Sequence, residues 1–192
     1  MTSSDELLPA VEDSLKGGVK AVQLREKDLG IRELLRLAYR MREVTGRYKA
    51  AFFINGRVDV ALAVGAEGVH LGGADIPVHA ARKAAGDGML IGASTHSIAE
   101  AKRAEQEGAD FITVGPIYET PSKLRYGRPI GPGEIRRVRE EVSIPVFAIG
   151  GISKDRVAEV LREGACGVAL ISAILASGNI KSSTEEFMRL LR

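Results

Sequence analysis

The 192-residue chain is poor in cysteine, in aromatic residues and in net charge. Its one cysteine, Cys166, cannot form an internal disulfide, and the sequence shows neither a secretory leader nor an apolar run of membrane-spanning length. These absences predict a reducing, cytoplasmic location. The 27 basic and 25 acidic residues are interspersed and leave a net charge of +2. No basic stripe therefore points to nucleic acid or to a membrane surface as a partner, and no cysteine and histidine cluster has metal-ligand spacing.

The chain does contain enough apolar material for one core. Hydrophobic residues make up 45% of the sequence, and the mean hydropathy is zero. A chain of this length can bury a full core in one domain. Because linkers and low-complexity runs are absent, we expect a single barrel domain that spans residues 1–192.

A repeated helix-to-strand unit organises the sequence. In several places a helical pattern ends at a glycine in a C-cap position, and a short apolar strand follows. These segments are 16–24, 64–71, 107–114 and 163–170, and further apolar strands are expected at 50–54, 89–93 and 145–149. Helical patterns fill residues 5–16, 31–45, 57–65, 77–86, 97–107, 133–141, 153–163 and 183–191.

The alternation of seven strands and eight helices predicts an α/β fold of the (β/α)8 TIM-barrel type that lacks its first strand. Short crossovers and the absence of a dinucleotide-binding glycine fingerprint favour a barrel over an open doubly wound sheet. Without an eighth strand, the strands at 19–23 and 167–171 keep unpaired edges. Such edges fray or associate, so a homo-oligomer is one outcome that the pattern leaves open.

Two strand ends predict a phosphate site. The apolar run 145–149 breaks into a glycine pair that includes Gly151, before a helical pattern that begins at Ser153, and a later strand ends at Ile171 and Ser172. Glycine allows close backbone approach, and a helix start offers unpaired N–H groups and a positive dipole end. Barrels of this type usually bind phosphate after their seventh and eighth strands. The alternative is a tight glycine turn in which Ser153 is a simple N-cap.

Polar residues follow other strand ends, where barrel enzymes carry their active groups. Strand alternation sends Gln23, Arg25 and Lys27 to one side, and two cations on one face suit a diphosphate. Asn55 is a candidate for binding a heterocycle or a phosphate. Asp75 is a candidate Mg2+ ligand, because Mg2+ takes few carboxylates and completes its shell with phosphates and water. The alternatives are a solvated charged loop for the segment with Arg25 and Lys27, a plain turn residue for Asn55, and an N-cap for Asp75.

The strand at 89–93 is followed by Ser94 and His96. At the barrel mouth His96 would have a titration range suited to proton transfer, although a loop histidine without such a role is an equal alternative. Ser97 is predicted to cap the next helix together with Glu100 in a capping box, and is therefore structural.

One long loop, residues 115–132, follows the strand at 107–114. A loop of this length in a compact domain is usually functional and often forms a lid. Thr120, Ser122 and Lys123 supply hydroxyl groups and a cation for a phosphate. The alternative is a passive surface excursion.

Taken together, these motifs resemble the thiamine-phosphate synthase family, which includes related thiazole tautomerases. The resemblance runs from about Leu15 to Ile174 and rests on the combination QLREK, INxRVDVAL, GVHLG, STHS, GPIYxTxSK and VFAIGGI. It implies a (β/α)8 barrel that joins hydroxymethylpyrimidine diphosphate to a thiazole phosphate. Pyrophosphate would leave with the help of Mg2+, through a carbocation-like pyrimidine.

The resemblance also implies a role for each candidate residue. Such a reaction requires mainly the positioning of two reactants and stabilisation of the departing diphosphate, so cations and a metal suffice without a strong base. By position, Gln23, Arg25, Lys27, Asn55 and Lys123 would hold the pyrimidine diphosphate, Asp75 would hold Mg2+, Ser94 would lie beside the reacting centre, and Thr120, Ser122, Gly151, Ile171 and Ser172 would line the thiazole phosphate.

Some positions depart from the synthase pattern. At 55–56 the chain has Asn-Gly where synthases typically carry Asn-Asp, and at 72–73 it has Gly-Gly where they carry Gly-Gln. The glycine at 56 and the Glu-Thr pair at 119–120 are more similar to the tautomerase branch, for which the resemblance implies a catalytic role of His96. The retained cations and Asp75 favour the synthase. We therefore expect a synthase, with a tautomerase as the alternative and a catalytically inactive regulatory barrel as a third possibility.

Overall fold

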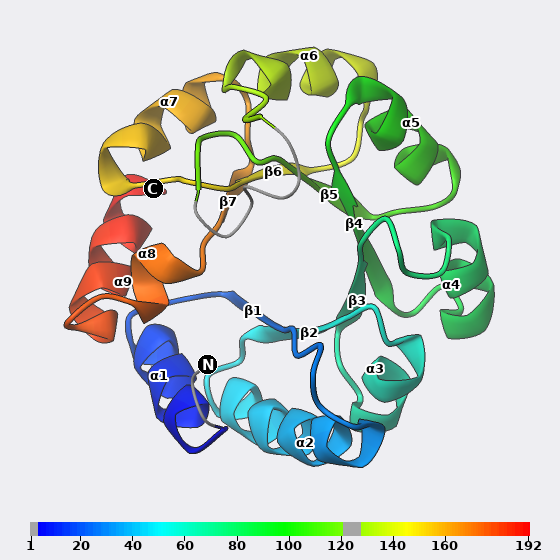
Figure 1. Cartoon of the computed structure of the whole chain (residues 1–192), viewed down its shortest axis with the longest axis vertical. Coiled ribbons are helices and arrows are strands. Elements are labelled where there is room, and N and C mark those ends of the chain that lie inside the picture. Colours follow the sequence, from blue (N-terminus) through cyan, green and yellow to red (C-terminus); the bar gives the residue numbers. More distant parts are fainter. Residues whose placement is uncertain (1–3, 121–127) are drawn as a thin grey trace.

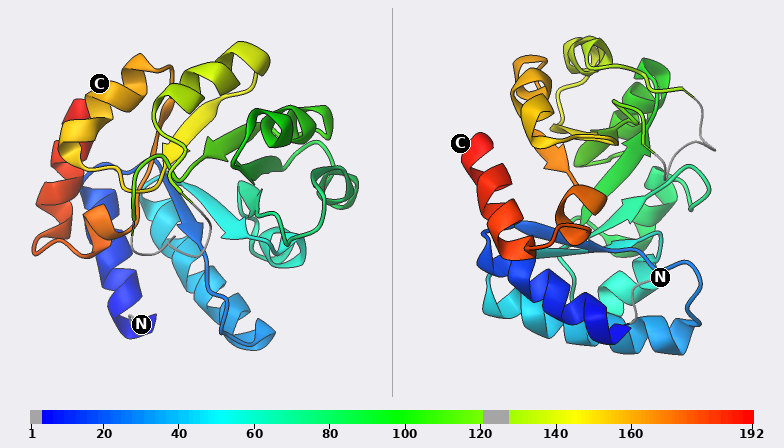
Figure 2. Two further views of the ribbon diagram at one scale, coloured as in Figure 1. Left: turned by 45° about the horizontal axis from the view of Figure 1, so that its top comes forward. Right: turned by 60° about the vertical axis from the view of Figure 1, so that its left-hand side comes forward.

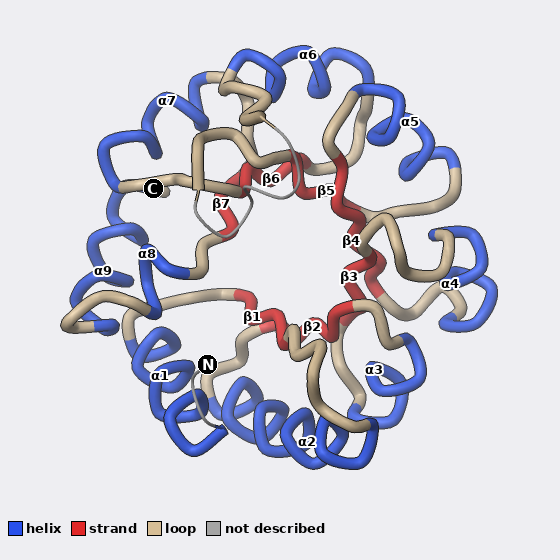
Figure 3. Tube along the Cα trace, viewed as in Figure 1, coloured by secondary structure: helices blue, strands red, loops and turns tan. Residues whose placement is uncertain are grey.

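The structure, a computed structural model, describes residues 4–120 and 128–192. In this part of the chain seven parallel strands pair in sequence order and curl into an open ring (Figure 3). The helices lie around the outside of the ring (Figures 1 and 2). The strands are β1 (Ala21–Leu24), β2 (Ala51–Asn55), β3 (Gly68–Leu71), β4 (Leu90–Thr95), β5 (Phe111–Val114), β6 (Val146–Ile149) and β7 (Gly167–Ala169). The helices are α1 (Ser4–Lys16), α2 (Ile31–Arg47), α3 (Val58–Val64), α4 (Val78–Ala85), α5 (Ile98–Gln106), α6 (Gly133–Glu141), the 3-10 helix η2 (Lys154–Arg156), α7 (Val157–Arg162), α8 (Ser172–Leu175) and α9 (Ile180–Leu190).

This arrangement confirms the predicted seven-stranded β/α barrel. The predicted strands and helices are all present, with ends that shift by a few residues. Gly65 ends α3 in the left-handed conformation, with φ +62°, as a C-cap glycine should. Two details were predicted wrongly: the helix expected from Ser153 begins with η2, and the short helix α8 was not expected. None of the helices within the described ranges is long and apolar enough to cross a membrane.

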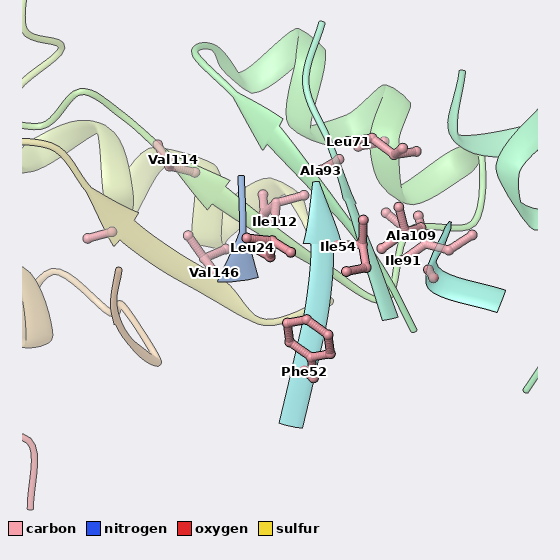
Figure 4. Close-up of a cluster of buried hydrophobic side chains, with 14 of the residues drawn as sticks. Leu24, Phe52, Ile54, Leu71, Ile91, Ala93, Ala109, Ile112, Val114 and Val146 are labelled. Carbon is pink, nitrogen blue, oxygen red and sulfur yellow. The ribbon is translucent and has the colours of Figure 1, made fainter. Parts of the chain in front are cut away.

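The outward-facing side chains of the strands form the main core. Phe52, Ile54, Ile91 and Ile112 are fully buried (Figure 4). They belong to one cluster with buried residues of the helices, such as Met41 of α2. Because successive residues of a strand point to opposite faces, this pattern leaves the alternate residues for the inside of the ring.

Aromatic rings from β2, β5 and β6 pack against one another inside the ring. The centre of the Phe111 ring lies 5.4 Å from that of Phe53 and 5.7 Å from that of Phe147. A neighbouring strand carries glycine where these rings need room: a Cβ on Gly68 would lie 2.5 Å from the Phe53 ring. Polar residues such as Gln23 and Asn55 lie nearer the carboxyl ends of the strands, at the rim.

Within the described residues, β1 pairs with β2 and β7 pairs with β6, and no ladder joins β1 to β7. We expect that fusing an apolar strand and a short loop ahead of α1 will raise the melting temperature by about 3–8 °C, because a right-handed crossover would place the new strand beside β1. Thermal melting of the fusion checks this. A control fusion with prolines at alternate positions should give no gain, and an equal melting temperature for both fusions would show that seven strands suffice.

Candidate functional site

Two predicted substrate-binding residues meet at the rim formed by the carboxyl ends of the strands. The Nε2 group of Gln23 in β1 donates a 2.9 Å hydrogen bond to Oδ1 of Asn55 at the end of β2. Asn55 in turn lies beside His70 of β3 in the sheet register. Because the Asn55 oxygen accepts from Gln23, its NH2 group is the part that can donate to a ligand.

His70 of β3 makes polar contacts inside the barrel. It is 4% exposed, and its Nε2 lies 2.9 Å from Oγ of Ser94 and 3.3 Å from Oγ1 of Thr113. A buried imidazole therefore fixes the position of the serine predicted to lie beside the reacting centre. The sequence held a usable signal, because alternation in GVHL puts His70 on the face opposite Val69 and Leu71, inside the barrel.

Asp75 lies in the loop after β3, against Gly56 in the loop after β2. Its Oδ2 accepts a 2.7 Å hydrogen bond from the N–H of Gly72. A Cβ on Gly56, where φ is +69°, would lie 2.5 Å from Oδ1 of Asp75. The carboxylate of Asp75 thus occupies the space in which a side chain at position 56 would begin.

Arg25 and Lys27 lie in the loop directly after β1, and both are exposed. Among the residues that the structure describes, neither of them has a carboxylate partner within ion-pair distance. Two such cations can bind an anion without breaking an existing ion pair. The predicted residues Ser122 and Lys123 lie outside the described residues.

His96 follows β4 and is exposed. Its Nδ1 donates a hydrogen bond to the carbonyl of Gly115, and its backbone N–H donates to Glu100 at 2.8 Å. Since a carbonyl only accepts, Nδ1 carries a proton, and Nε2 is the ring nitrogen left to contact a ligand. Ser97 caps α5 as predicted, accepting from the N–H of Glu100, but the Glu100 carboxylate accepts from His96 and not from Ser97, so the predicted capping box is only half formed.

At the predicted phosphate end, the segment after β5 lies on the glycine turn after β6. Backbone hydrogen bonds of 2.9 and 3.0 Å run from residues 117–118 to residues 149–150. Gly151 has φ +64°, and a Cβ there would lie 2.5 Å from the carbonyl oxygen of Glu119. The half-buried Thr120 follows in the same segment. The structure thus brings the segment of Thr120 to the turn that carries Gly151.

The rest of the predicted phosphate site has a different local structure from the one expected. Ile171 is 62% exposed, and Ser172, also exposed, begins α8. The side chain of Ser153 makes no capping hydrogen bond. Helices α7 and α8 have only six and four residues. The helix start expected at Ser153 is therefore a 3-10 turn followed by a six-residue helix, and this end offers mainly the backbone N–H groups of its turns.

Comparison with known proteins agrees with these features. The family model described as thiamine monophosphate synthase matches residues 1–174. Proteins named thiamine-phosphate synthase from Methanospirillum hungatei JF-1 and Clostridium novyi are 44% and 41% identical over 94% and 93% of this chain, and over 87% and 88% of their own lengths. A solved structure of thiamine phosphate pyrophosphorylase from Pyrococcus furiosus is 40% identical, with a TM-score of 0.89 over 96% of this chain and 88% of that chain.

Proposed function

Because the chain belongs to the thiamine-phosphate synthase family, we propose that it joins hydroxymethylpyrimidine diphosphate to thiazole phosphate and releases pyrophosphate. The thiazole nitrogen forms a bond to the pyrimidine methylene carbon, whose bond to the diphosphate oxygen breaks and leaves its electron pair on pyrophosphate. The main observation behind this proposal is a shared rim. Amide, hydroxyl and cationic groups at the ends of β1 to β4 lie at the same end of the barrel as the glycine turn after β6. Product analysis of the wild-type protein with both substrates and Mg2+ tests it.

Arg25 and Lys27 bind the diphosphate and neutralise the charge that grows on it as the bond breaks. A planar guanidinium gives bidentate contacts to phosphate oxygens, and a lysine adds a mobile point charge. Such stabilisation of a leaving group is often the largest part of catalysis. Lys123, which the sequence places in the long loop, supplies a third cation in this proposal.

The residues present fit a Mg2+ ion that arrives with its diphosphate. Over residues 4–120 and 128–192, no group of three or more His, Cys, Asp or Glu side chains is arranged to hold a metal. Mg2+ commonly uses one or two carboxylates together with phosphate oxygens and water, so a single rim carboxylate is a suitable donor. Asp75 would hold the ion, which when bound neutralises negative charge on the leaving diphosphate.

The pyrimidine lies, in this proposal, over the polar cluster at the rim. The NH2 group of Asn55, whose oxygen is engaged by Gln23, donates to the ring or to its diphosphate. Ser94 stands beside the reacting carbon, held by the buried imidazole of His70. These residues orient the pyrimidine, so that the thiazole nitrogen attacks along a productive line.

The thiazole phosphate lies at the other end of the site. Backbone N–H groups of the turn around Gly151, with the hydroxyls of Thr120, Ser122 and Ser172, hold its phosphate, and Ile171 offers apolar contact to the ring. Both substrates are phosphorylated small molecules. We place the reaction in the cytoplasm, since a chain with one cysteine suits a reducing compartment.

One observation favours a second candidate, the thiazole tautomerase. The bond from Nδ1 of His96 to the Gly115 carbonyl leaves Nε2 as the nitrogen that can exchange a proton with a ligand, and a tautomerase needs a group that moves a proton. Gly56 also favours the tautomerase, because synthases typically carry a carboxylate at this position. The names of the relatives and the pair of cations after β1 support the synthase instead.

The His96→Asn variant separates the two candidates. Coupling requires no strong base, so we expect this variant to form thiamine phosphate within about threefold of the wild-type rate; a tautomerase that loses its general base slows by roughly 10²–10⁴-fold. The rates of both reactions are measured on both proteins. Thiamine phosphate formation that falls by more than about a hundredfold would assign His96 to the chemical step and contradict the proposed roles.

A further inference from the structure

A cluster of three side chains joins the two backbone segments of the proposed thiazole phosphate end. Nη1 of Arg156 donates a 2.7 Å hydrogen bond to the carbonyl of Gly151, and the Arg156 guanidinium lies 4.4 Å from the centre of the Tyr118 ring. The Tyr118 hydroxyl donates to the carboxylate of Glu159. We call Arg156, Tyr118 and Glu159 the Arg156 clamp. Its members come from η2, from the segment after β5 and from α7.

The Arg156 clamp reinforces two segments that backbone hydrogen bonds already join. Besides the bonds from residues 117–118 to 149–150, the N–H groups of Ile130 and Gly131 donate to residues 116–117 at 2.9 and 3.1 Å. Both ends of the long loop are thereby held beside the turn of Gly151. Thr120 lies only two residues beyond Tyr118, so a fixed Tyr118 limits where Thr120 can go.

The hydrogen bond from Arg156 also orients a peptide group. In a trans peptide the N–H points away from the carbonyl, so holding the Gly151 carbonyl toward Arg156 turns the N–H of Ile152 to the opposite side. Among the residues that the structure describes, that N–H has no hydrogen-bond acceptor. An oriented backbone donor without an acceptor is suited to a phosphate oxygen.

We propose that Arg156 and Tyr118 are positioning residues that preorganise the thiazole phosphate end, by holding the Gly151 turn and the Thr120 segment as one unit. The inference rests on the proposed function. Preorganisation favours binding because the segments are already ordered, so the ligand does not have to offset their loss of conformational entropy. Burial first, and then the hydrogen bond to Glu159, raises the pKa of Tyr118 to about 12. The hydroxyl therefore keeps its proton, and the clamp stays intact across ordinary assay conditions.

The test compares kinetic constants for the two substrates in matched variants. Arg156→Met should raise KM for thiazole phosphate about tenfold, and Tyr118→Phe about threefold, while kcat and KM for the pyrimidine diphosphate stay within about twofold. Arg156→Lys should recover part of the loss, because it keeps the charge without the planar fork. The control is Arg136→Met, which removes a 3.1 Å ion pair between Arg136 of α6 and Glu163, the residue after α7, and should leave both KM values unchanged.

Equal rises in the two KM values, or a lower melting temperature with unchanged KM, would overturn the inference, since a purely structural contact acts in that way. A wild type that couples no substrates would defeat the proposed function, and the joining of the two segments by the Arg156 clamp is then tested by itself. Amide hydrogen exchange then decides it: faster exchange at residues 117–118 in Arg156→Met than in Arg136→Met supports the clamp, and equal exchange overturns it.

Discussion

Replacing Gly151 with valine is expected to lower the melting temperature by about 10 °C and to weaken thiazole phosphate binding more than about a hundredfold. Gly151 has φ +64°, and a Cβ there would lie 2.5 Å from the Glu119 carbonyl oxygen and 2.9 Å from Cβ of Tyr118. A β-branched residue strongly avoids this backbone conformation. Backbone strain and overpacking together lower the free energy of unfolding by about 3–5 kcal/mol. Residues 117–120 must move off the turn to relieve the clash.

The control for this substitution is Gly178→Val. Gly178 has open space around the position of a Cβ, with nothing within 4 Å, so its valine variant should melt within about 3 °C of the wild type. Thermal melting and calorimetric titration with thiazole phosphate measure both effects. Wild-type affinity in Gly151→Val would place the phosphate elsewhere.

Replacing Asp75 with asparagine is expected to raise the Mg2+ concentration for half-maximal coupling by roughly 10–100-fold, because the proposed protein carboxylate ligand is lost. The amide oxygen can still accept the hydrogen bond that Gly72 donates to Asp75, so the loop should keep its shape. Asp87→Asn is the control, since Asp87 is exposed in the loop between α4 and β4. Equal Mg2+ dependence in wild type and Asp75→Asn would remove Asp75 from the metal site.

The reverse change, Gly56→Asp, tests the same point by adding the carboxylate that synthases typically carry there. Aspartate tolerates the left-handed backbone of Gly56 better than most residues. Its side chain would begin against the carboxylate of Asp75, so without metal the like charges should lower the melting temperature. Added Mg2+ should relieve that repulsion, raise the melting temperature more than in wild type and lower the Mg2+ requirement for coupling. A melting temperature insensitive to Mg2+ would contradict this.

The barrel could be predicted from the sequence because each unit of the fold is specified locally. In residues 64–71 a glycine ends the helix and an apolar run follows, and the structure has the end of α3, the cap Gly65 and β3 in that order. Such units repeat, so the parallel pairing follows from the order of elements. Helix α8 was missed because four residues after Ile171 are too few to show a helical period.

The candidate site could be predicted one strand at a time, but its contacts could not. The apolar runs correctly placed Gln23 and Asn55 near strand ends, yet their hydrogen bond joins residues 32 positions apart. The contacts of His70 depend on Ser94 and Thr113, which lie on two other strands. The position of Asp75 against the glycine at 56 depends on the shapes of two loops, which residue types alone do not specify.

The most direct test of the proposed function is product analysis of the wild-type protein incubated with hydroxymethylpyrimidine diphosphate, thiazole phosphate and Mg2+. We expect thiamine phosphate and pyrophosphate in equal amounts, with formation that stops when Mg2+ is chelated. Isomerisation of a thiazole carboxylate phosphate without thiamine phosphate formation would contradict the synthase and establish the tautomerase. Turnover in neither assay would contradict both and leave a regulatory barrel.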